Sequence, residues 1–236
     1  MQRYHFCEID LAAIRHNVGV MKSHIAGGAR FLAVVKADAY GHGAVPVAKA
    51  ALEAGADMLA VAIPEEGIEL REAGIAAPIL VLGGIEESAA EAVVQNDLTQ
   101  VVFDERRIRA LAQAGQKLGR CAKVHLKLDT GMNRIGVRTA EEAQALTLLI
   151  DSLPGVALTG CFTHMATADE PDPTGTLRQI ERFEALCKAV KAVHPGEIIC
   201  HGANTASIFR YPQLHADMVR GGIALWKPAI FDIEDP

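Results

Sequence analysis

The chain has 236 residues, half of them hydrophobic, and a formal net charge of -6. This length can form one large core or two modest ones, and the acidic balance argues against nucleic acid as a partner. Apolar runs stay well short of the roughly 20 residues of a membrane-spanning helix, and the first ten residues lack the apolar stretch of a signal peptide. We therefore expect a cytoplasmic protein.

The first elements in chain order are a strand and a helix. Residues 3–10 alternate like a strand, and Asp10 can cap a helix over residues 11–25. At the other end, the acidic "FDIEDP" carries no structural pattern. We therefore expect a single domain over residues 1–236.

An apolar run over residues 30–36 ends in Lys36. Gly41 and Gly43 then allow the backbone to turn tightly, and from Ala44 the apolar residues recur at helical spacing. Lysines often end strands only because the ammonium reaches solvent. Here the lysine precedes a loop that leads into a helix, which is where ligands bind in α/β proteins.

Strand-like apolar runs recur along the whole chain, at 30–36, 58–62, 78–82, 99–103, 122–128, 156–162, 197–201 and 217–224. Most gaps between them have a helical pattern, which indicates a parallel sheet with both faces covered. Eight such units predict an α/β fold of the closed (β/α)₈ TIM-barrel type, with the strand at 3–10 as an extra N-terminal element. An open doubly wound sheet is the alternative, weakened because no GxGxxG follows the first run.

Unusual polar residues stand where these strands should end, as a barrel enzyme requires: Lys36, Lys127, Arg134, His164, Asn204 and Arg220. Each has a structural alternative. Lys127 could form a rim ion pair with Asp129, and His164 could be a satisfied core histidine. No metal is expected, since His164 and Asp169 lack a third ligand at suitable spacing. The five cysteines form no CxxC pair, which favours buried free thiols.

Small-residue loops follow the seventh and eighth runs, "ANTAS" and "RGGIA". This pair of loops is the usual phosphate site of such barrels, because backbone N–H groups approach an anion where side chains are small. A lysine in a dry pocket beside other cations can form a Schiff base. A phosphate together with a Schiff-base aldehyde describes pyridoxal 5'-phosphate. A lysine aldolase acting on a sugar phosphate fits nearly as well.

The segment "AVVKADAYGHG" resembles the signature of alanine racemases. "EIDLAAIRHN", "HLKLDTGMNRIG", "THMATADE" and "RGGIALW" are similar to other segments of that family, in the same order and at the expected spacing. The resemblance implies a pyridoxal-phosphate isomerase that interconverts L- and D-alanine, the latter a peptidoglycan precursor. It also implies a homodimer in which each barrel is followed by a β-rich C-terminal domain.

The resemblance also implies how the cofactor is bound. Lys36 would carry it as a Schiff base and act as one of two catalytic bases. The phosphate would lie against four residues, Tyr40, Thr205, Gly222 and Ile223, and further cofactor contacts would come from Leu82 and Asn204.

The remaining site residues are placed in the same way. The His164 imidazole would lie against the cofactor ring, and Arg220 would face the pyridine nitrogen and disfavour its protonation. Arg134 would approach the cofactor's phenolic oxygen and the substrate. Lys127 matches a lysine that is carbamylated in many members. Racemisation needs two bases on opposite faces of the substrate, each able to act as an acid in turn.

Some positions depart from the family pattern. Gly221 stands where proline is usual, Thr205 where serine is usual, and Trp226 where tyrosine is usual. The C-terminal domain, which supplies a catalytic tyrosine to the partner's barrel, is expected to be missing, and activity should then be weakened. Two other interpretations stay open. One is a non-catalytic barrel of the pyridoxal-phosphate homeostasis type, and the other is an inactive folded fragment.

Overall fold

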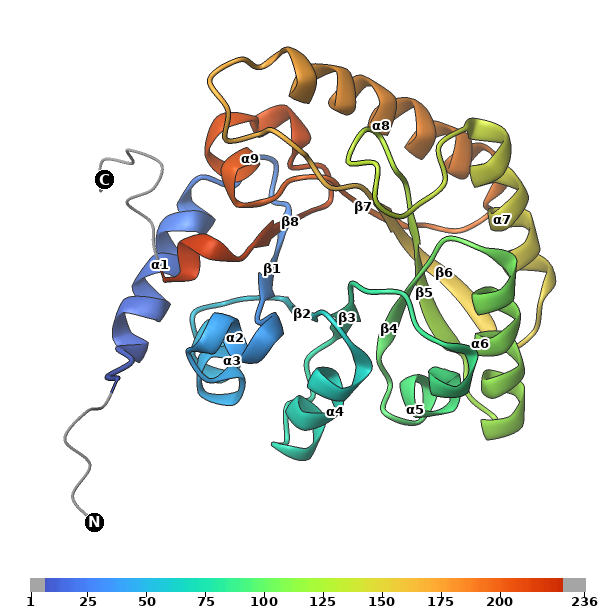
Figure 1. Ribbon diagram of the computed structural model, residues 1–236, viewed down its shortest axis with the longest axis horizontal. Coiled ribbons are helices and arrows are strands. Elements are labelled where there is room, and N and C mark those ends of the chain that lie inside the picture. Colours follow the sequence, from blue (N-terminus) through green and yellow to red (C-terminus); the bar gives the residue numbers. More distant parts are fainter. Residues whose placement is uncertain (1–6, 227–236) are drawn as a thin grey trace.

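The computed structural model describes residues 7–226, and eight parallel strands form a barrel in it (Figure 1). The strands are β1 (Arg30–Val34), β2 (Met58–Val61), β3 (Ile79–Val81), β4 (Thr99–Val102), β5 (Ala122–Lys127), β6 (Val156–Phe162), β7 (Ile199–His201) and β8 (Met218–Gly221). Their order around the sheet is β7-β6-β5-β4-β3-β2-β1-β8. All eight lie within the runs predicted from the sequence.

The sheet closes on itself. Strand β1 pairs with β2 on one side and with β8 on the other. Between β7 and β8, the Asp217 amide donates to the Cys200 carbonyl, 3.1 Å away, and the Arg220 amide donates to the Ala203 carbonyl, 3.0 Å away. These bonds complete the ring, which confirms the barrel and excludes the open doubly wound sheet.

Helices surround the barrel on its outer side (Figure 1). They are α1 (Leu11–Ser23), α2 (Lys36–Gly41), α3 (Ala44–Glu53), α4 (Pro64–Glu72), α5 (Ala90–Gln95), α6 (Glu105–Leu118), α7 (Ala140–Ser152), α8 (Thr174–Val193) and α9 (Thr205–Arg210), with short 3₁₀ turns η1 (Glu87–Ala89), η2 (Pro212–Leu214) and η3 (Ile223–Leu225). Within residues 7–226, every helix is too short or too polar to cross a membrane.

The strands bury both of their faces, which explains why their sequences are apolar without alternation. A small cluster fills the inside of the barrel and includes Leu32, Met58, Leu80 and Met218. A larger cluster packs the outer face of the strands against the helices. Side chains at the strand ends are therefore the ones that can reach the barrel mouth.

In the N-terminal residues that the structure describes, the predicted helix cap is present and the predicted strand is not seen. Asp10 caps α1 as predicted, and its side chain accepts from the Ala12 and Ala13 amides. Buried Asn17 donates to the Leu225 carbonyl at 2.8 Å and so fixes α1 to η3, the last described turn. The strand predicted over 3–10 falls largely outside the described residues, and its residues 7–10 form no strand.

Candidate active site

A cavity of about 660 Å³ opens at the C-terminal ends of the strands. This volume is typical of a site for a small molecule or cofactor. The cavity brings together all the site residues expected from the sequence: Lys36, Tyr40, Leu82, Lys127, Arg134, His164, Asn204, Thr205, Arg220, Gly222 and Ile223. It also contains Phe162, Met132 and Asp169, which the sequence analysis did not place there.

Lys36 lies just beyond β1, at the start of a left-handed turn. Residues 37–40 all have φ between 51° and 56°. None of them is glycine, and left-handed backbone costs such residues roughly 1–2 kcal/mol each. Backbone strain of this kind persists only where the surroundings enforce it, and it concentrates at functional sites. Gly41 and Gly43, with φ of 85° and 89°, complete the turn as predicted.

Two carboxylates hold this turn in place. Glu66 on α4 accepts from the Ala37 amide at 2.7 Å and, through its other oxygen, from the Ala62 amide at 2.6 Å. Asp38 accepts from the Ala44 amide at 2.6 Å and so links the turn to α3. Glu66 therefore positions the backbone next to Lys36 from the following βα unit. The sequence analysis missed it, because its only signal was a helical pattern.

Arg220 on β8 is a buried cation of the cavity, with 4 % of its surface exposed. One nitrogen, Nη2, donates to the Thr163 carbonyl at 2.8 Å and lies 3.4 Å from His164 Nδ1. The other, Nη1, donates to the His201 carbonyl and ring. Burial lowers its pKa to about 9. These partners are neutral, so the guanidinium presents an uncompensated positive charge to the cavity.

A pair of buried histidines supports Arg220 from inside the barrel. Arginine only donates, so His201 must accept through Nδ1, 3.1 Å from the guanidinium. The proton of His201 then lies on Nε2 and is donated to His125 Nδ1 at 2.9 Å. Burial, followed by the nearby Arg220, holds the pKa of His201 well below its usual range. Both rings are therefore neutral and orient the guanidinium without competing for its charge.

His164 and Lys127 are also shifted toward their neutral forms. Burial, together with the positive charges of Arg220 and Arg134, lowers the pKa of His164 to about 3. Burial and Arg220 lower the pKa of Lys127 to about 7, although nearby Asp129 acts in the opposite direction. The Lys127 ammonium donates to the Leu128 carbonyl at 3.0 Å.

The loop after β5 carries Arg134 and is organised by Asp129. One oxygen of this buried carboxylate accepts from the Gly131 and Asn133 amides, at 3.2 and 2.9 Å. The other pairs with Arg138 at 3.2 Å. Asp129 thus shapes the loop through backbone hydrogen bonds, and its carboxylate forms an ion pair with Arg138 rather than with Lys127.

The small-residue loops after β7 and β8 meet at the wall of the cavity that lies beside Tyr40. The Asn204 side chain caps α9, and the Gly222 amide donates to the Thr205 hydroxyl at 3.0 Å. A Cβ at Gly222 would lie 3.2 Å from the Tyr40 hydroxyl, so glycine keeps this wall open. Burial raises the pKa of Tyr40, which stays a neutral hydrogen-bond donor.

Phe162, at the end of β6, forms the cavity floor beside Arg220. Its ring stacks on His201 with centroids 4.7 Å apart, and the Arg220 guanidinium lies 5.3 Å from its centroid. The strand-end rule applied to "CFTHMA" would have found it. No sequence pattern indicated a role for His201, because that role depends on its contact with Arg220 from β8.

Fold and cavity together define a (β/α)₈ barrel protein whose polar site is built from loops at the C-terminal strand ends. Residues 9–229 match the family model described as alanine racemase, N-terminal domain. The chain therefore belongs to the alanine racemase N-terminal domain family, as the motifs had indicated.

Individual relatives support the same family assignment. The chain is 49 % identical over 220 residues to an alanine racemase of Symbiobacterium thermophilum, covering 93 % of this chain and 58 % of that one. It is 47 % identical to one from Desulfovibrio desulfuricans, covering 95 % and 61 %. The alanine racemase structure from Clostridium difficile 630 superposes with a TM-score of 0.90 at 37 % identity, covering 96 % of this chain and 59 % of that chain. The chain thus spans about three fifths of the length of these relatives.

Proposed function

We propose that this chain is the cofactor-binding barrel of an alanine racemase, and that it binds pyridoxal 5'-phosphate at Lys36 and acts on L- and D-alanine. The observation that carries the proposal is the convergence of Lys36, Arg220 and the small-residue loops on one cavity. Support also comes from relatives named alanine racemase that match over nearly the whole of this chain.

The cavity suits this cofactor in size and in the distribution of its polar groups. A primary amine, Lys36, lies at one wall, and the glycine-lined wall of Gly222 and Thr205 lies where an anion can approach the backbone. A neutral, flat ring, His164, and a buried cation, Arg220, line the same cavity next to each other. An aldehyde, a phosphate and an aromatic ring would thus each meet a complementary group.

The proposed roles follow from the charges of these groups. The bound cofactor would delocalise the negative charge that forms when alanine loses its α-proton. Arg220 would keep the pyridine nitrogen unprotonated, because a fixed buried cation disfavours a second positive charge beside it. Lys36 would take and return the α-proton on one face of the substrate. Neutral His164 would pack against the cofactor without adding charge.

The proposal also covers the second catalytic base, the homodimer and the location of the protein. By resemblance, the second base is a tyrosine of a domain outside these 236 residues, donated by the partner in a homodimer. A cytoplasmic location remains a prediction from the sequence.

The first test is covalent trapping of the cofactor. The chain would be incubated with pyridoxal 5'-phosphate, reduced with borohydride, digested and examined by mass spectrometry. We expect the label on the peptide that contains Lys36, none in Lys36→Ala, and an unchanged label in Lys49→Ala, which removes an exposed lysine of α3. A label that stays on the same peptide in Lys36→Ala would overturn the assignment.

Trapping alone does not separate a racemase from a non-catalytic barrel. A chain that takes the label at Lys36 but leaves the α-proton of both alanine enantiomers in place would be the homeostasis-type binder. Loss of the α-proton from either enantiomer, dependent on Lys36, supports the proposed function.

A further inference from the structure

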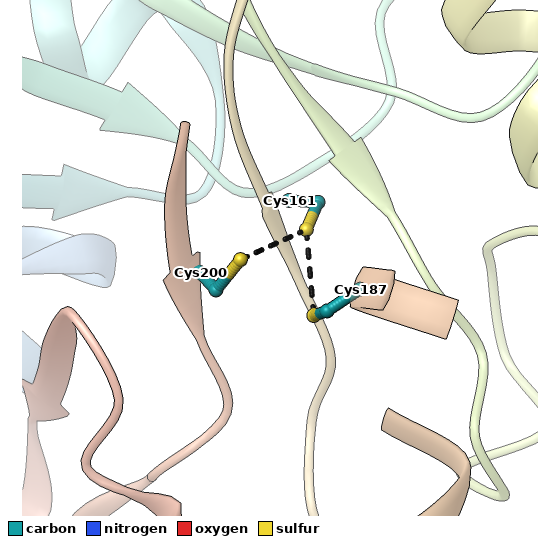
Figure 2. A group of neighbouring side chains, drawn as sticks. All are labelled: Cys161, Cys187 and Cys200. Carbon is teal, nitrogen blue, oxygen red and sulfur yellow. Dashed lines mark hydrogen bonds between the residues drawn. The ribbon is translucent and has the colours of Figure 1, made fainter. Parts of the chain in front are cut away.

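Three cysteines from three different elements lie close together (Figure 2). Cys161 lies on β6, Cys187 on α8 and Cys200 on β7. The Cys161 sulfur is 3.6 Å from that of Cys187 and 3.6 Å from that of Cys200. All three sulfurs lie within 4.8 Å of one another. In residues 7–226 this is the one group of histidine, cysteine and acidic side chains that meets the geometric requirement for holding a metal ion.

The cluster lies on the outer side of the barrel wall, beneath α8. Neighbouring residues of a strand point to opposite faces. Phe162 and His201, which follow Cys161 and Cys200, stack on each other beside Arg220 inside the barrel mouth. The cysteines therefore point outward, toward Cys187. None of the three lines the catalytic cavity, so the proposed racemase function leaves this cluster without a role.

The local charges favour a thiolate in the cluster. The pKa of Cys200 is lowered by hydrogen bonds from the Cys161 and Cys187 thiols and by the nearby Lys191 ammonium. The pKa of Cys161 is raised by its neighbouring sulfurs and by burial. One negative charge can thus be shared among three sulfurs, with a cation beside it.

Two of the sulfur–sulfur distances in the cluster are close to those around a sulfur-coordinated ion. With zinc–sulfur bonds of about 2.3 Å and tetrahedral angles, neighbouring sulfurs are separated by about 3.8 Å. Two of the three separations are already within a few tenths of an ångström of that value, at 3.6 Å. Sulfur ligands select soft or borderline ions such as Zn²⁺ over Mg²⁺ or Ca²⁺.

We infer that Cys161, Cys187 and Cys200 form a binding site for one thiophilic divalent cation of the Zn²⁺ class. The ion forms three metal–sulfur bonds, and each thiol that becomes a ligand releases its proton to solvent. The resulting centre has a net charge of -1, which Lys191 partly offsets. Cys187, 8 % exposed, is the member of the cluster nearest to solvent.

The occupied site would join β6, β7 and α8. Those strands carry Phe162 and His201, which contact Arg220. The inference does not depend on the proposed catalytic activity, because its test measures metal binding and stability without cofactor or alanine.

The test uses the reduced chain with both exposed cysteines removed, Cys7→Ala/Cys121→Ala. All cysteine ligation then comes from the cluster. Zn²⁺ affinity would be measured by competition with a chromophoric chelator, and X-ray absorption would count the sulfur ligands. We expect one Zn²⁺ per chain, three sulfur ligands and a rise in thermal unfolding temperature with Zn²⁺ concentration.

Single Cys161→Ala, Cys187→Ala and Cys200→Ala changes in this background should each weaken Zn²⁺ binding at least roughly 100-fold, since even outer partners of metal ligands typically contribute 10- to 100-fold. Circular dichroism would confirm folding. Cys187→Ala, at the solvent edge, is the variant least apt to disturb the core. Failure of the parent chain to bind stoichiometric Zn²⁺ would overturn the inference. A bound ion with nitrogen and oxygen ligands only, or one unaffected by a folded Cys187→Ala, would overturn it as well.

Discussion

Glu66 shows how a residue outside the cavity lining can determine the geometry of a site. Its carboxylate accepts from the Ala37 and Ala62 amides, so it ties the strained turn after Lys36 to the loop after β2. Glu66→Ala should lower the free energy of unfolding by about 2 kcal/mol, because two backbone N–H groups lose a charged acceptor. It should also reduce the fraction of Lys36 trapped by borohydride, because the turn relaxes.

Glu65→Ala is the matched control, since this neighbouring glutamate is exposed and should affect neither property. Glu66→Gln keeps one acceptor oxygen and should restore part of both. Unchanged trapping in Glu66→Ala at saturating cofactor would mean that the turn holds its conformation without the carboxylate.

Lys127 should make stability depend on pH in a particular direction. Its pKa is lowered from 10.5 to about 7, first by burial and then by Arg220. Between these two values the unfolded chain binds a proton that the native chain does not. The free energy of unfolding should therefore rise with pH from about 7 to 10.5, relative to Lys127→Met, by at most about 1.4 kcal/mol per pH unit. Urea denaturation in CO₂-free buffer measures this difference.

The control for Lys127 is Lys123→Met, on the same strand but exposed and paired with Asp97, which should leave the pH profile parallel to that of the parent. The same variants test the carbamylation expected by resemblance. A neutral amine adds CO₂ to give a carbamate and a proton, so ¹³C-bicarbonate should give a carbamate resonance that Lys127→Met removes and Lys123→Met keeps. A resonance surviving in Lys127→Met would assign it elsewhere.

At the level of elements, one substitution should have opposite effects in two helices. Gly19 lies on the exposed side of α1 with no atom within 4 Å of a Cβ built there. Gly115 lies in α6, where a Cβ would collide with the Gly155 carbonyl. Gly19→Ala should stabilise the chain by about 1 kcal/mol through helix propensity. Gly115→Ala should destabilise it by roughly 1–3 kcal/mol, because overpacking outweighs propensity.

Thermal and urea unfolding of the two variants, side by side, check this prediction. Each serves as the control for the other, because the chemical change is identical. Stabilisation by both substitutions would mean that α6 can move away from the loop before β6 at little cost.

The sequence predicted the elements well wherever hydrophobic periodicity determines them. The strands and the longer helices follow from apolar runs and helical spacing, and the Asp10 cap follows from residue type. The left-handed turn over residues 37–40 could not be predicted in this way. Alanine, aspartate and tyrosine do not prefer positive φ, so the conformation comes from distant acceptors such as Glu66 rather than from local preference.

For the whole molecule, a strand-end rule found six of the polar residues of the cavity: Lys36, Lys127, Arg134, His164, Asn204 and Arg220. The rule works because every parallel strand of a barrel ends at the same rim. The loops that contain Thr205, Gly222 and Ile223 were predicted from their small residues, and the individual roles of these residues, with Tyr40 and Leu82, came from family resemblance. The three-cysteine cluster was beyond either approach. Its members are separated by 26 and 39 residues in the chain and meet only when α8 packs across β6 and β7.

The polypeptide of 236 residues, loaded with pyridoxal 5'-phosphate, should act on only one face of alanine. The family resemblance implies that Lys36 would serve the D-alanine face and that a tyrosine outside these residues would serve the L face. Lack of one positioned acid–base group typically costs ~10²–10⁴-fold in rate, so net racemisation should be slow. Lys36 should still remove the α-proton of D-alanine and return a deuteron to the same face in heavy water. Proton NMR should therefore show exchange of the α-proton in D-alanine faster than in L-alanine, while chiral chromatography shows little inversion.

Lys36→Ala is the control, and it should exchange the α-proton of alanine no faster than free cofactor does. Rapid and equal racemisation in both directions would mean that a second base lies within these residues.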